Sequence, residues 1–280
     1  MHPYLYQSQG LCVPAYPFFY GLGVAVAGVV LAVLLRRDGY SLRRSASLFF
    51  LGALATVVGG QILYGVVRWS LVEDDIGGFL ALVSGGQILY GSLLLVVPTI
   101  WLFTNLLRIR PSAAFDALAV GAALGLAIGR IGCLLGGCCH GRPCAAAWGV
   151  RYPKMIDVEG NTVGTEPFLQ HLGAGLIPPS ADFSLPVYPV PLYECIAALG
   201  VFAILLGLWR RQRLTGRLGA VLVVCYAPLR FGLEFLRVQE PVLIGLTLAQ
   251  LLSIAIGTVA VWLCLGTARN HRRRTDLLEM

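Results

Sequence analysis

Two arginines lie inside stretches of sequence that are otherwise apolar enough to span a lipid bilayer. Arg130 falls within AVGAALGLAIGRIGCLLGG, which ends at Gly137, and Arg230 falls within LGAVLVVCYAPLRFGLEFLR, which ends at Arg237. A charged side chain near the centre of a membrane helix costs roughly 2.5 to 3.5 kcal/mol on insertion scales, and arginine is not deprotonated in proteins. We therefore expect both arginines to face an anion. A phosphate suits them, because the guanidinium fork binds phosphate oxygens bidentately.

The residues around each arginine leave two interpretations open. Tyr226, Arg230 and Glu234 recur at every fourth position, so they share one face of a helix. Arg230 and Glu234 could simply neutralise each other as an i, i+4 pair. Arg130, in contrast, has no acidic residue within a turn of its helix, and nearby glycines leave space for a ligand: Gly129, Gly132, Gly136 and Gly137. We therefore favour a ligand anion, and at this depth we expect the phosphate of a phospholipid head group.

Composition places the chain among integral membrane proteins. Hydrophobic residues make up 57% of the 280 and charged residues only 12%, and the mean hydropathy is +0.77. Stretches of about 20 apolar residues predict membrane helices, and they occur near 16–35, 48–67, 88–107, 113–137, 190–209, 218–237 and 242–266. The first stretch follows a polar segment without a basic region or cleavage site, so we expect a retained helix rather than a signal peptide. We predict an all-α polytopic membrane protein with about seven transmembrane helices, forming one integral membrane domain over residues 1–280.

Arginine clusters indicate which side of the membrane each loop faces. Short cytoplasmic loops carry an excess of Lys and Arg. Such clusters follow the first, third, fifth and seventh stretches: Arg36, Arg37, Arg43, Arg44, Arg108, Arg110, Arg210, Arg211, Arg213, Arg217, Arg269, Arg272, Arg273 and Arg274. We therefore expect the N-terminus outside and the C-terminus in the cytoplasm. The net charge of +7 reflects this arrangement, and no nucleic acid partner is expected.

The segment from His140 to Pro189 is the longest between the predicted membrane helices, and it is rich in Pro, Gly and polar residues. It falls on the outer side, so we predict a small periplasmic loop or cap between the fourth and fifth spans. At 1.5 Å per residue, Arg130 lies roughly 25 Å and Arg230 roughly 18 Å from the cytoplasmic ends of their helices. Both arginines are therefore expected in the outer half of the membrane.

The heptapeptide GGQILYG occurs at 59–65 and again at 85–91. Two interpretations remain open. The copies are either chance similarity between small-residue motifs that pack helices together, or bends at which the backbone approaches a ligand.

Four cysteines surround His140: Cys133, Cys138, Cys139 and Cys144. A zinc site is one interpretation, but the spacing matches no familiar zinc motif, and the adjacent Cys138 and Cys139 are not expected to bind one ion easily. A disulfide from Cys138 or Cys139 to Cys144 is another, because the outer face is oxidising. Packing of buried thiols is the third. We expect no metal.

Four short elements stand in order along the chain. Phe-Tyr-Gly-Leu occupies 19–22, Gly-Arg-Ile-Gly at 129–132 is followed by His-Gly-Arg-Pro at 140–143, Pro-Leu-Tyr-Glu at 191–194 follows Pro189, and YAPLRFGLEFLR occupies 226–237. Together they resemble the motifs of the bacterial prolipoprotein diacylglyceryl transferase family. The members of this family are membrane enzymes with seven spans. The resemblance covers most of the chain.

The resemblance implies transfer of a diacylglyceryl group from phosphatidylglycerol to the thiol of a lipobox cysteine in a prolipoprotein, with release of glycerol phosphate, at the bacterial inner membrane. Arg130 and Arg230 would hold the phosphate and stabilise its charge as the bond to the glyceryl carbon breaks. The residues that would bind the lipid are Tyr20, Gly132, Arg142, Glu194, Tyr226 and Glu234. The expected partners are phosphatidylglycerol, prolipoproteins and membrane lipids, without a cofactor.

The chain departs from the family at the position of the base. Tyr90 stands where the family carries histidine, and a tyrosine of pKa about 10 is a poor base at pH 7 compared with a histidine of pKa about 6.5. His140 is a candidate to replace it as the group that deprotonates the acceptor thiol. The alternative is that His140 is an exposed loop residue and the thiolate arises from the field of the arginines.

Further departures concern the head-group site. Cys133, Gly136 and Cys138 stand where the family carries Asn, Asn and Glu, so hydrogen-bonding groups are lost. Two alternatives to the family's activity follow: a transferase of the same fold with another phospholipid donor or acceptor, and a non-catalytic protein that binds or transports phospholipid.

Overall fold

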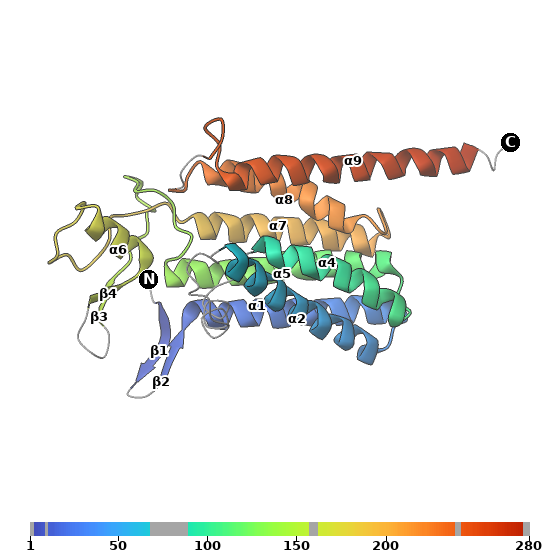
Figure 1. Cartoon of the computed structure of the whole chain (residues 1–280), viewed down its shortest axis with the longest axis horizontal. Coiled ribbons are helices and arrows are strands. Elements are labelled where there is room, and N and C mark those ends of the chain that lie inside the picture. The colour runs from blue at the N-terminus through green and yellow to red at the C-terminus, as the bar shows by residue number, and fades with distance from the viewer. Residues whose placement is uncertain (1–2, 9–10, 68–88, 157–161, 239–241, 277–280) are drawn as a thin grey trace. The chain divides into compact units, whose positions relative to one another are not determined.

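The computed structural model describes residues 3–8, 11–67, 89–156, 162–238 and 242–276, which are mostly helical (Figure 1). The helices are α1 (Ala15–Arg37), α2 (Leu42–Val67), α4 (Leu89–Leu106), α5 (Pro111–Gly136), α6 (Glu166–Gly173), α7 (Val190–Arg210), α8 (Leu218–Glu234) and α9 (Leu248–Asp276). The strands are β1 (Tyr4–Ser8), β2 (Leu11–Pro14), β3 (Lys154–Ile156) and β4 (Thr162–Gly164).

Each of the predicted apolar stretches overlaps one of the helices α1, α2, α4, α5, α7, α8 and α9. Within the described ranges, four of these are long and apolar enough to cross a membrane: α1, α2, α5 and α7. Shorter apolar segments lie in α4 (Gly91–Leu106) and α9 (Leu248–Trp262). A polytopic, mainly helical membrane protein is therefore confirmed, while the number of crossings stays a prediction.

Two antiparallel hairpins depart from the all-α prediction. β1 pairs with β2 before α1, and β3 pairs with β4 within the segment predicted as a cap. These strands have three to five residues each, which is too short for a clear alternation of apolar and polar positions.

The structure divides into two compact units, Gly28–Leu118 and the remainder of the chain. Within the unit Gly28–Leu118, α2 packs along α4 (Figure 1). Gly59 and Gly91 lie face to face where the two backbones come closest, and a Cβ atom on either glycine would collide with the carbonyl of the other. Ser92 Oγ donates a hydrogen bond of 2.7 Å to the carbonyl of Thr56 beside this contact.

This contact bears on the GGQILYG repeat. Gly59 opens the first copy, which lies within the continuous helix α2, and Gly91 closes the second copy. Residues 85–88 of the second copy lie outside the described residues. The glycines allow two helices to approach closely, so this part of the structure favours the helix-packing interpretation of the repeat.

In the other unit, α8 packs against both α7 and α9 (Figure 1). The first turns of α1 pack on α5, where a Cβ atom on Gly23 would lie 2.5 Å from the carbonyl oxygen of Gly125. Small residues at this crossing let the two backbones touch. Helices α5, α7 and α8 are the elements that carry the predicted phosphate site.

The described residues between Gly137 and Pro189 include β3, β4 and α6 and lie beside one end of α5 and α7 (Figure 1). Tyr152 is fully buried in this region. The Tyr152 hydroxyl donates a hydrogen bond of 2.8 Å to the carbonyl of Leu134, and burial raises the pKa of this phenol well above its usual value. Gly141 forms a bridge with Arg237, just beyond α8. The region is thus anchored to the ends of two of the helices that carry the site.

Candidate functional site

Four charged side chains from three helices meet in one cluster. Arg130 extends from α5, Glu194 from α7, and Arg230 and Glu234 from α8. The Nε atom of Arg130 lies 2.7 Å from Oε2 of Glu194, and Nη1 of Arg230 lies 3.8 Å from Oε1 of the same carboxylate. Arg230 also pairs with Glu234, one turn further along α8. The two arginines that the sequence singled out therefore share one carboxylate.

Glu194 is completely buried, whereas the two arginine side chains keep 17% and 20% of their surface. Among the described residues, neither oxygen of Glu194 has a partner with hydrogen-bond geometry, and the same holds for Nε of Arg130. The 2.7 Å contact is thus an ion pair without good hydrogen-bond alignment. A buried carboxylate in this condition depends on the two adjacent cations, because burying a charge is costly unless it is paired.

Glu234, in contrast, has partners on both oxygens. One accepts from Arg230, and Oε1 accepts a hydrogen bond of 3.1 Å from the hydroxyl of Thr247, ahead of α9. Thr247 is in turn fixed by Gln250, whose side-chain oxygen accepts from the Thr247 backbone amide at 3.0 Å. Nη1 of Arg230 therefore faces both carboxylates, in direct contact with Glu234 and 3.8 Å from Glu194.

This arrangement corrects the argument made from sequence for Arg130. Its lack of an acidic neighbour along α5 suggested that only a ligand could neutralise it, but Glu194 of α7 supplies that charge. The i, i+4 pair of Arg230 and Glu234 is also present. The formal charges of two arginines and two glutamates sum to zero. A phosphate would therefore have to bind through guanidinium N–H groups that these carboxylates do not use.

Tyr226 lies on the same face of α8 as Arg230 and is close enough to Arg130 and Glu194 to interact with both. It is half-buried. Of the residues assigned to the lipid, Tyr226, Glu194 and Glu234 are therefore brought together with the arginines.

The other assigned residues are placed elsewhere. Tyr20 is 40% exposed on α1 and stacks on Tyr16, with ring centroids 6.1 Å apart. Arg142 has an exposed side chain, and its backbone amide donates to the carbonyl of Leu236. Gly132 lies in a close contact of α5 with α1, where an added Cβ would be 2.9 Å from that of Phe19, so helix packing explains this glycine. Tyr90 lies in α4, and its side chain falls outside the described part of the structure.

His140 is only 7% exposed, so the interpretation of it as an exposed loop residue is wrong. Its Nδ1 lies 2.9 Å from the carbonyl oxygen of Gly141. A carbonyl oxygen only accepts, so Nδ1 must carry the proton, and a neutral ring then has Nε2 available to accept one.

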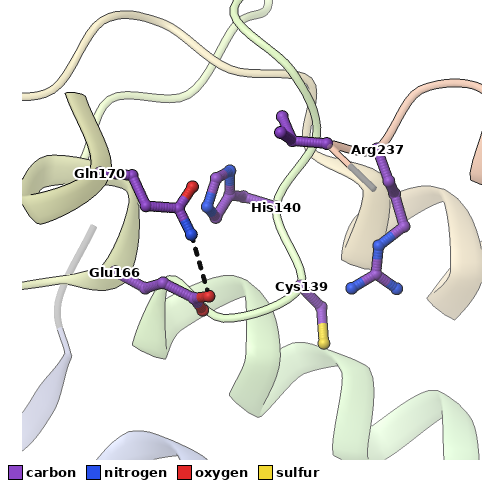
Figure 2. A pocket seen from close by; sticks show the side chains of 6 residues that line it. Cys139, His140, Glu166, Gln170 and Arg237 are labelled. Carbon is purple, nitrogen blue, oxygen red and sulfur yellow. Dashed lines mark hydrogen bonds between the residues drawn. The ribbon is translucent and has the colours of Figure 1, made fainter. Parts of the chain in front are cut away.

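Figure 2 shows the pocket around His140, which has a volume of about 80 Å³. The imidazole points toward Gln170 and Glu166 of α6, and the Gln170 amide donates to Glu166 at 3.1 Å. Arg237 and the thiol of Cys139 line the pocket as well. The pocket therefore brings together an imidazole, a carboxyl group, a guanidinium group and a cysteine. Glu166, Gln170 and Thr247 were not identified from sequence, because contacts between separate elements leave no local pattern.

Three of the four cysteines around His140 form a cluster. The sulfur atoms of Cys133, Cys138 and Cys139 all lie within 4.8 Å of one another. Nη1 of Arg130 lies 3.9 Å from the sulfur of Cys133, which links the cluster to the charged site. Cys144 is outside the cluster, and all four cysteines are free, so the disulfide to Cys144, one of the three interpretations, is not present in the described structure.

Electrostatics separate the two adjacent thiols. Hydrogen bonds from Cys133 and Cys138, with the positive charges of Arg237 and Arg130, hold the pKa of Cys139 well below its ordinary value. The pKa of Cys138 is raised, because its proton is held in hydrogen bonds to Cys133 and Cys139 and because it is buried. The surroundings therefore favour ionisation of Cys139 over that of Cys138.

Comparisons with known proteins identify the family of the chain. A family model described as prolipoprotein diacylglyceryl transferase matches residues 3–265. The chain is 27% identical to the phosphatidylglycerol--prolipoprotein diacylglyceryl transferase 2 of Clostridium perfringens (strain 13 / Type A), with 88% of both chains covered. It is 27% identical to the phosphatidylglycerol--prolipoprotein diacylglyceryl transferase of Pseudoalteromonas atlantica, with 98% of this chain and 92% of the relative covered. The match extends over nearly the whole chain, and it confirms the resemblance seen in the motifs: the chain belongs to the prolipoprotein diacylglyceryl transferase family.

Proposed function

We propose that this chain transfers a diacylglyceryl group from phosphatidylglycerol to the cysteine thiol of a prolipoprotein. The main support for this proposal is that Arg130 and Arg230 both face the buried carboxylate of Glu194. Two permanent cations at one point within apolar helices suit a phosphodiester whose negative charge grows during the reaction.

In the proposed reaction, the acceptor sulfur attacks the glyceryl carbon next to the phosphate. The carbon–oxygen bond breaks, and glycerol phosphate leaves with the bonding electrons. Arg130 and Arg230 hold the phosphate oxygens and stabilise the charge that collects there. Glu194 keeps both guanidinium groups oriented before the lipid arrives. A preformed arrangement of this kind spends little energy on reorganisation in the transition state.

The acceptor thiol must lose its proton, and we propose His140 as the group that takes it. A free thiol with a pKa near 8.5 supplies only a few per cent thiolate at neutral pH. The hydrogen bond from His140 Nδ1 to Gly141 leaves Nε2 as the accepting atom. Tyr90 would be the weaker base, because its phenol ordinarily ionises near pH 10.

For the membrane arrangement, we propose seven spans with the N-terminus outside and the C-terminus in the cytoplasm. The arginine clusters support this orientation through the positive-inside rule. Residues 140–189 then form a cap on the outer side, and the charged site opens toward the outer leaflet. A bacterial inner membrane is consistent with the family and with the apolar helices.

The proposal is tested with the purified full chain in vesicles that contain phosphatidylglycerol, supplied with a peptide carrying a lipobox cysteine. We expect release of glycerol phosphate together with a mass gain on the peptide equal to one diacylglyceryl group. A matched peptide with serine in place of cysteine should gain no mass.

The two alternative functions give different outcomes in this assay. Transfer from phosphatidylethanolamine instead of phosphatidylglycerol would indicate the same chemistry with another donor. Lipid that copurifies with the chain while no peptide is modified would contradict transferase activity and favour a phospholipid-binding protein.

A further inference from the structure

The turn that follows α5 brings two adjacent thiols to the same side of the backbone. Gly137 and Cys139 adopt φ angles of 82° and 60°, and the second is uncommon for a residue with a side chain. Side chains of adjacent residues normally diverge, but here Cys138 and Cys139 both approach Cys133 of the last turn of α5. From sequence, the adjacent Cys138 and Cys139 were not expected to bind one ion. In this structure both sulfurs face the same side, so adjacency does not prevent it.

The spacing of the three sulfurs is close to that of a metal site. Zinc binds thiolates at about 2.3 Å in tetrahedral geometry, which places the sulfurs about 3.8 Å apart. The sulfurs lie within 4.8 Å of one another, so the contraction needed to close around an ion is small. Thiolate ligands select thiophilic cations such as zinc and copper(I) over magnesium or calcium.

The cluster lies where the acceptor thiol of the proposed reaction must arrive. Cys133 is 3.9 Å from the guanidinium of Arg130, which is proposed to hold the donor phosphate. Cys139 lines the pocket shown in Figure 2, with Arg237 beside it. A ligand bound to this cluster would therefore be next to the phosphate and accessible from the pocket.

We propose that Cys133, Cys138 and Cys139 bind a zinc ion whose fourth position takes the thiol of the acceptor cysteine, an inference that rests on the proposed transferase function. Zinc sites with three protein ligands and one open position are typical of catalysis rather than of structural support. A thiol that coordinates zinc is deprotonated. The metal would therefore supply the acceptor thiolate.

The reaction balances without an oxidant or reductant. The acceptor thiol would bind zinc, and its proton would pass to Nε2 of His140, the base proposed above, which lines the same pocket. The zinc-bound sulfur then forms a bond to the glyceryl carbon, and the carbon–oxygen bond to the phosphate breaks. Glycerol phosphate leaves with the electron pair, and the thioether product binds zinc weakly, because it has no negative charge.

The test begins with metal content. The full chain is purified under reducing conditions in detergent, equilibrated with zinc chloride, desalted, and analysed for metal by mass spectrometry. We expect about one zinc per chain in the unaltered protein. The Cys144→Ser variant should retain the same amount, because Cys144 lies outside the cluster, whereas Cys139→Ser and Cys133→Ser should retain almost none.

The second readout is the absorption spectrum of the protein loaded with cobalt(II) in place of zinc. We expect thiolate-to-cobalt charge-transfer bands, and a change in the visible bands when a lipobox cysteine peptide is added. The matched serine peptide should leave the spectrum unchanged. The inference would be overturned if Cys139→Ser retained as much zinc as the unaltered chain. It would also be overturned if the cysteine peptide left the cobalt spectrum unchanged.

Turnover separates this inference from the proposed function. Removal of zinc with a chelator should lower transfer at least about tenfold, and zinc but not magnesium should restore it. Full transfer by zinc-free protein would refute the metal site and leave the transferase function standing. A zinc site that responds to the peptide in a chain that transfers nothing would contradict the transferase function and retain the metal site.

Discussion

The carboxylate of Glu194 lies 2.7 Å from Nε of Arg130, and neither group has a well-aligned hydrogen bond within the described structure. A buried ion pair of this kind contributes little net stability, because the cost of removing both charges from water offsets their attraction. The role of this ion pair is to position the arginine side chains. Glu194 holds two guanidinium groups from different helices at the same point, where we propose that the phosphate binds.

Replacing either arginine by alanine should abolish transfer. We expect Arg130→Ala and Arg230→Ala each to lower kcat at least about 100-fold, the typical cost of removing one group that stabilises a transition-state oxyanion. Lysine at either position should recover little, because it lacks the planar fork that binds two phosphate oxygens. The measurement is glycerol phosphate release by purified variants in vesicles.

Arg151→Ala is the matched control for both changes. Arg151 is exposed in the region between α5 and α7, so its loss should leave the rate unchanged. Substantial activity in Arg130→Ala or Arg230→Ala, with normal insertion, would refute the assignment of the phosphate site.

Glu194→Gln tests whether a lipid phosphate can take the place of the internal carboxylate. The change leaves two partly buried arginines with one negative charge fewer, and breaking a buried ion pair costs about 3 kcal/mol. We expect a clear fall in the temperature of thermal unfolding in micelles without phosphatidylglycerol. Adding phosphatidylglycerol should raise that temperature more for the variant than for the unaltered chain, since the phosphate restores the missing charge.

Asp182→Asn serves as the control for this change, because it removes a negative charge from an exposed side chain. It should leave thermal unfolding unchanged with or without the lipid. An equal response of Glu194→Gln and the unaltered chain to phosphatidylglycerol would mean that the phosphate does not bind at this carboxylate.

His140→Ala tests the proposed base. We expect kcat to fall about 100-fold at pH 7, the scale of general base catalysis, while KM for the lipid stays the same. The deficit should narrow above about pH 8.5, where a free thiol ionises without assistance. Transfer is followed by the mass of the peptide across this pH range.

The control for His140 is His171→Asn. Nδ1 of His171 accepts a hydrogen bond of 3.2 Å from the backbone amide of Leu185, and the Asn side-chain oxygen can replace that acceptor. The control should therefore keep its activity. An unchanged rate in His140→Ala would remove His140 from the mechanism and favour the arginines or a metal as the source of the thiolate.

Much of the fold could be predicted from sequence, because membrane helices are encoded locally. Apolar stretches of sufficient length placed all the long helices, and the cost of burying charge drew attention to Arg130 and Arg230. The short hairpins were missed, since strands of three to five residues lack a detectable period.

Contacts between elements that are distant in the sequence could not be predicted. Glu194 entered only through the family resemblance, although it is the anion that neutralises Arg130. The cysteine cluster depends on the φ angle of Cys139, and no rule of spacing predicts that a cysteine will adopt this conformation. Both features arise from tertiary structure rather than from a local pattern.

The contact between α2 and α4 offers a prediction that is independent of catalysis. A Cβ atom at position 59 would collide with the carbonyl of Gly91, and backbone atoms cannot move aside as a flexible side chain can. We expect Gly59→Ala to force the helices apart and to lower the free energy of unfolding by about 1 to 3 kcal/mol, the usual cost of overpacking.

Gly200→Ala in α7 is the control, because an added Cβ there would meet nothing within 4 Å. Alanine is the better helix former by roughly 0.5 to 1 kcal/mol, so this control should be neutral or slightly stabilised in thermal unfolding. If the two variants unfold alike, close helix packing does not explain the first glycine of the GGQILYG repeat.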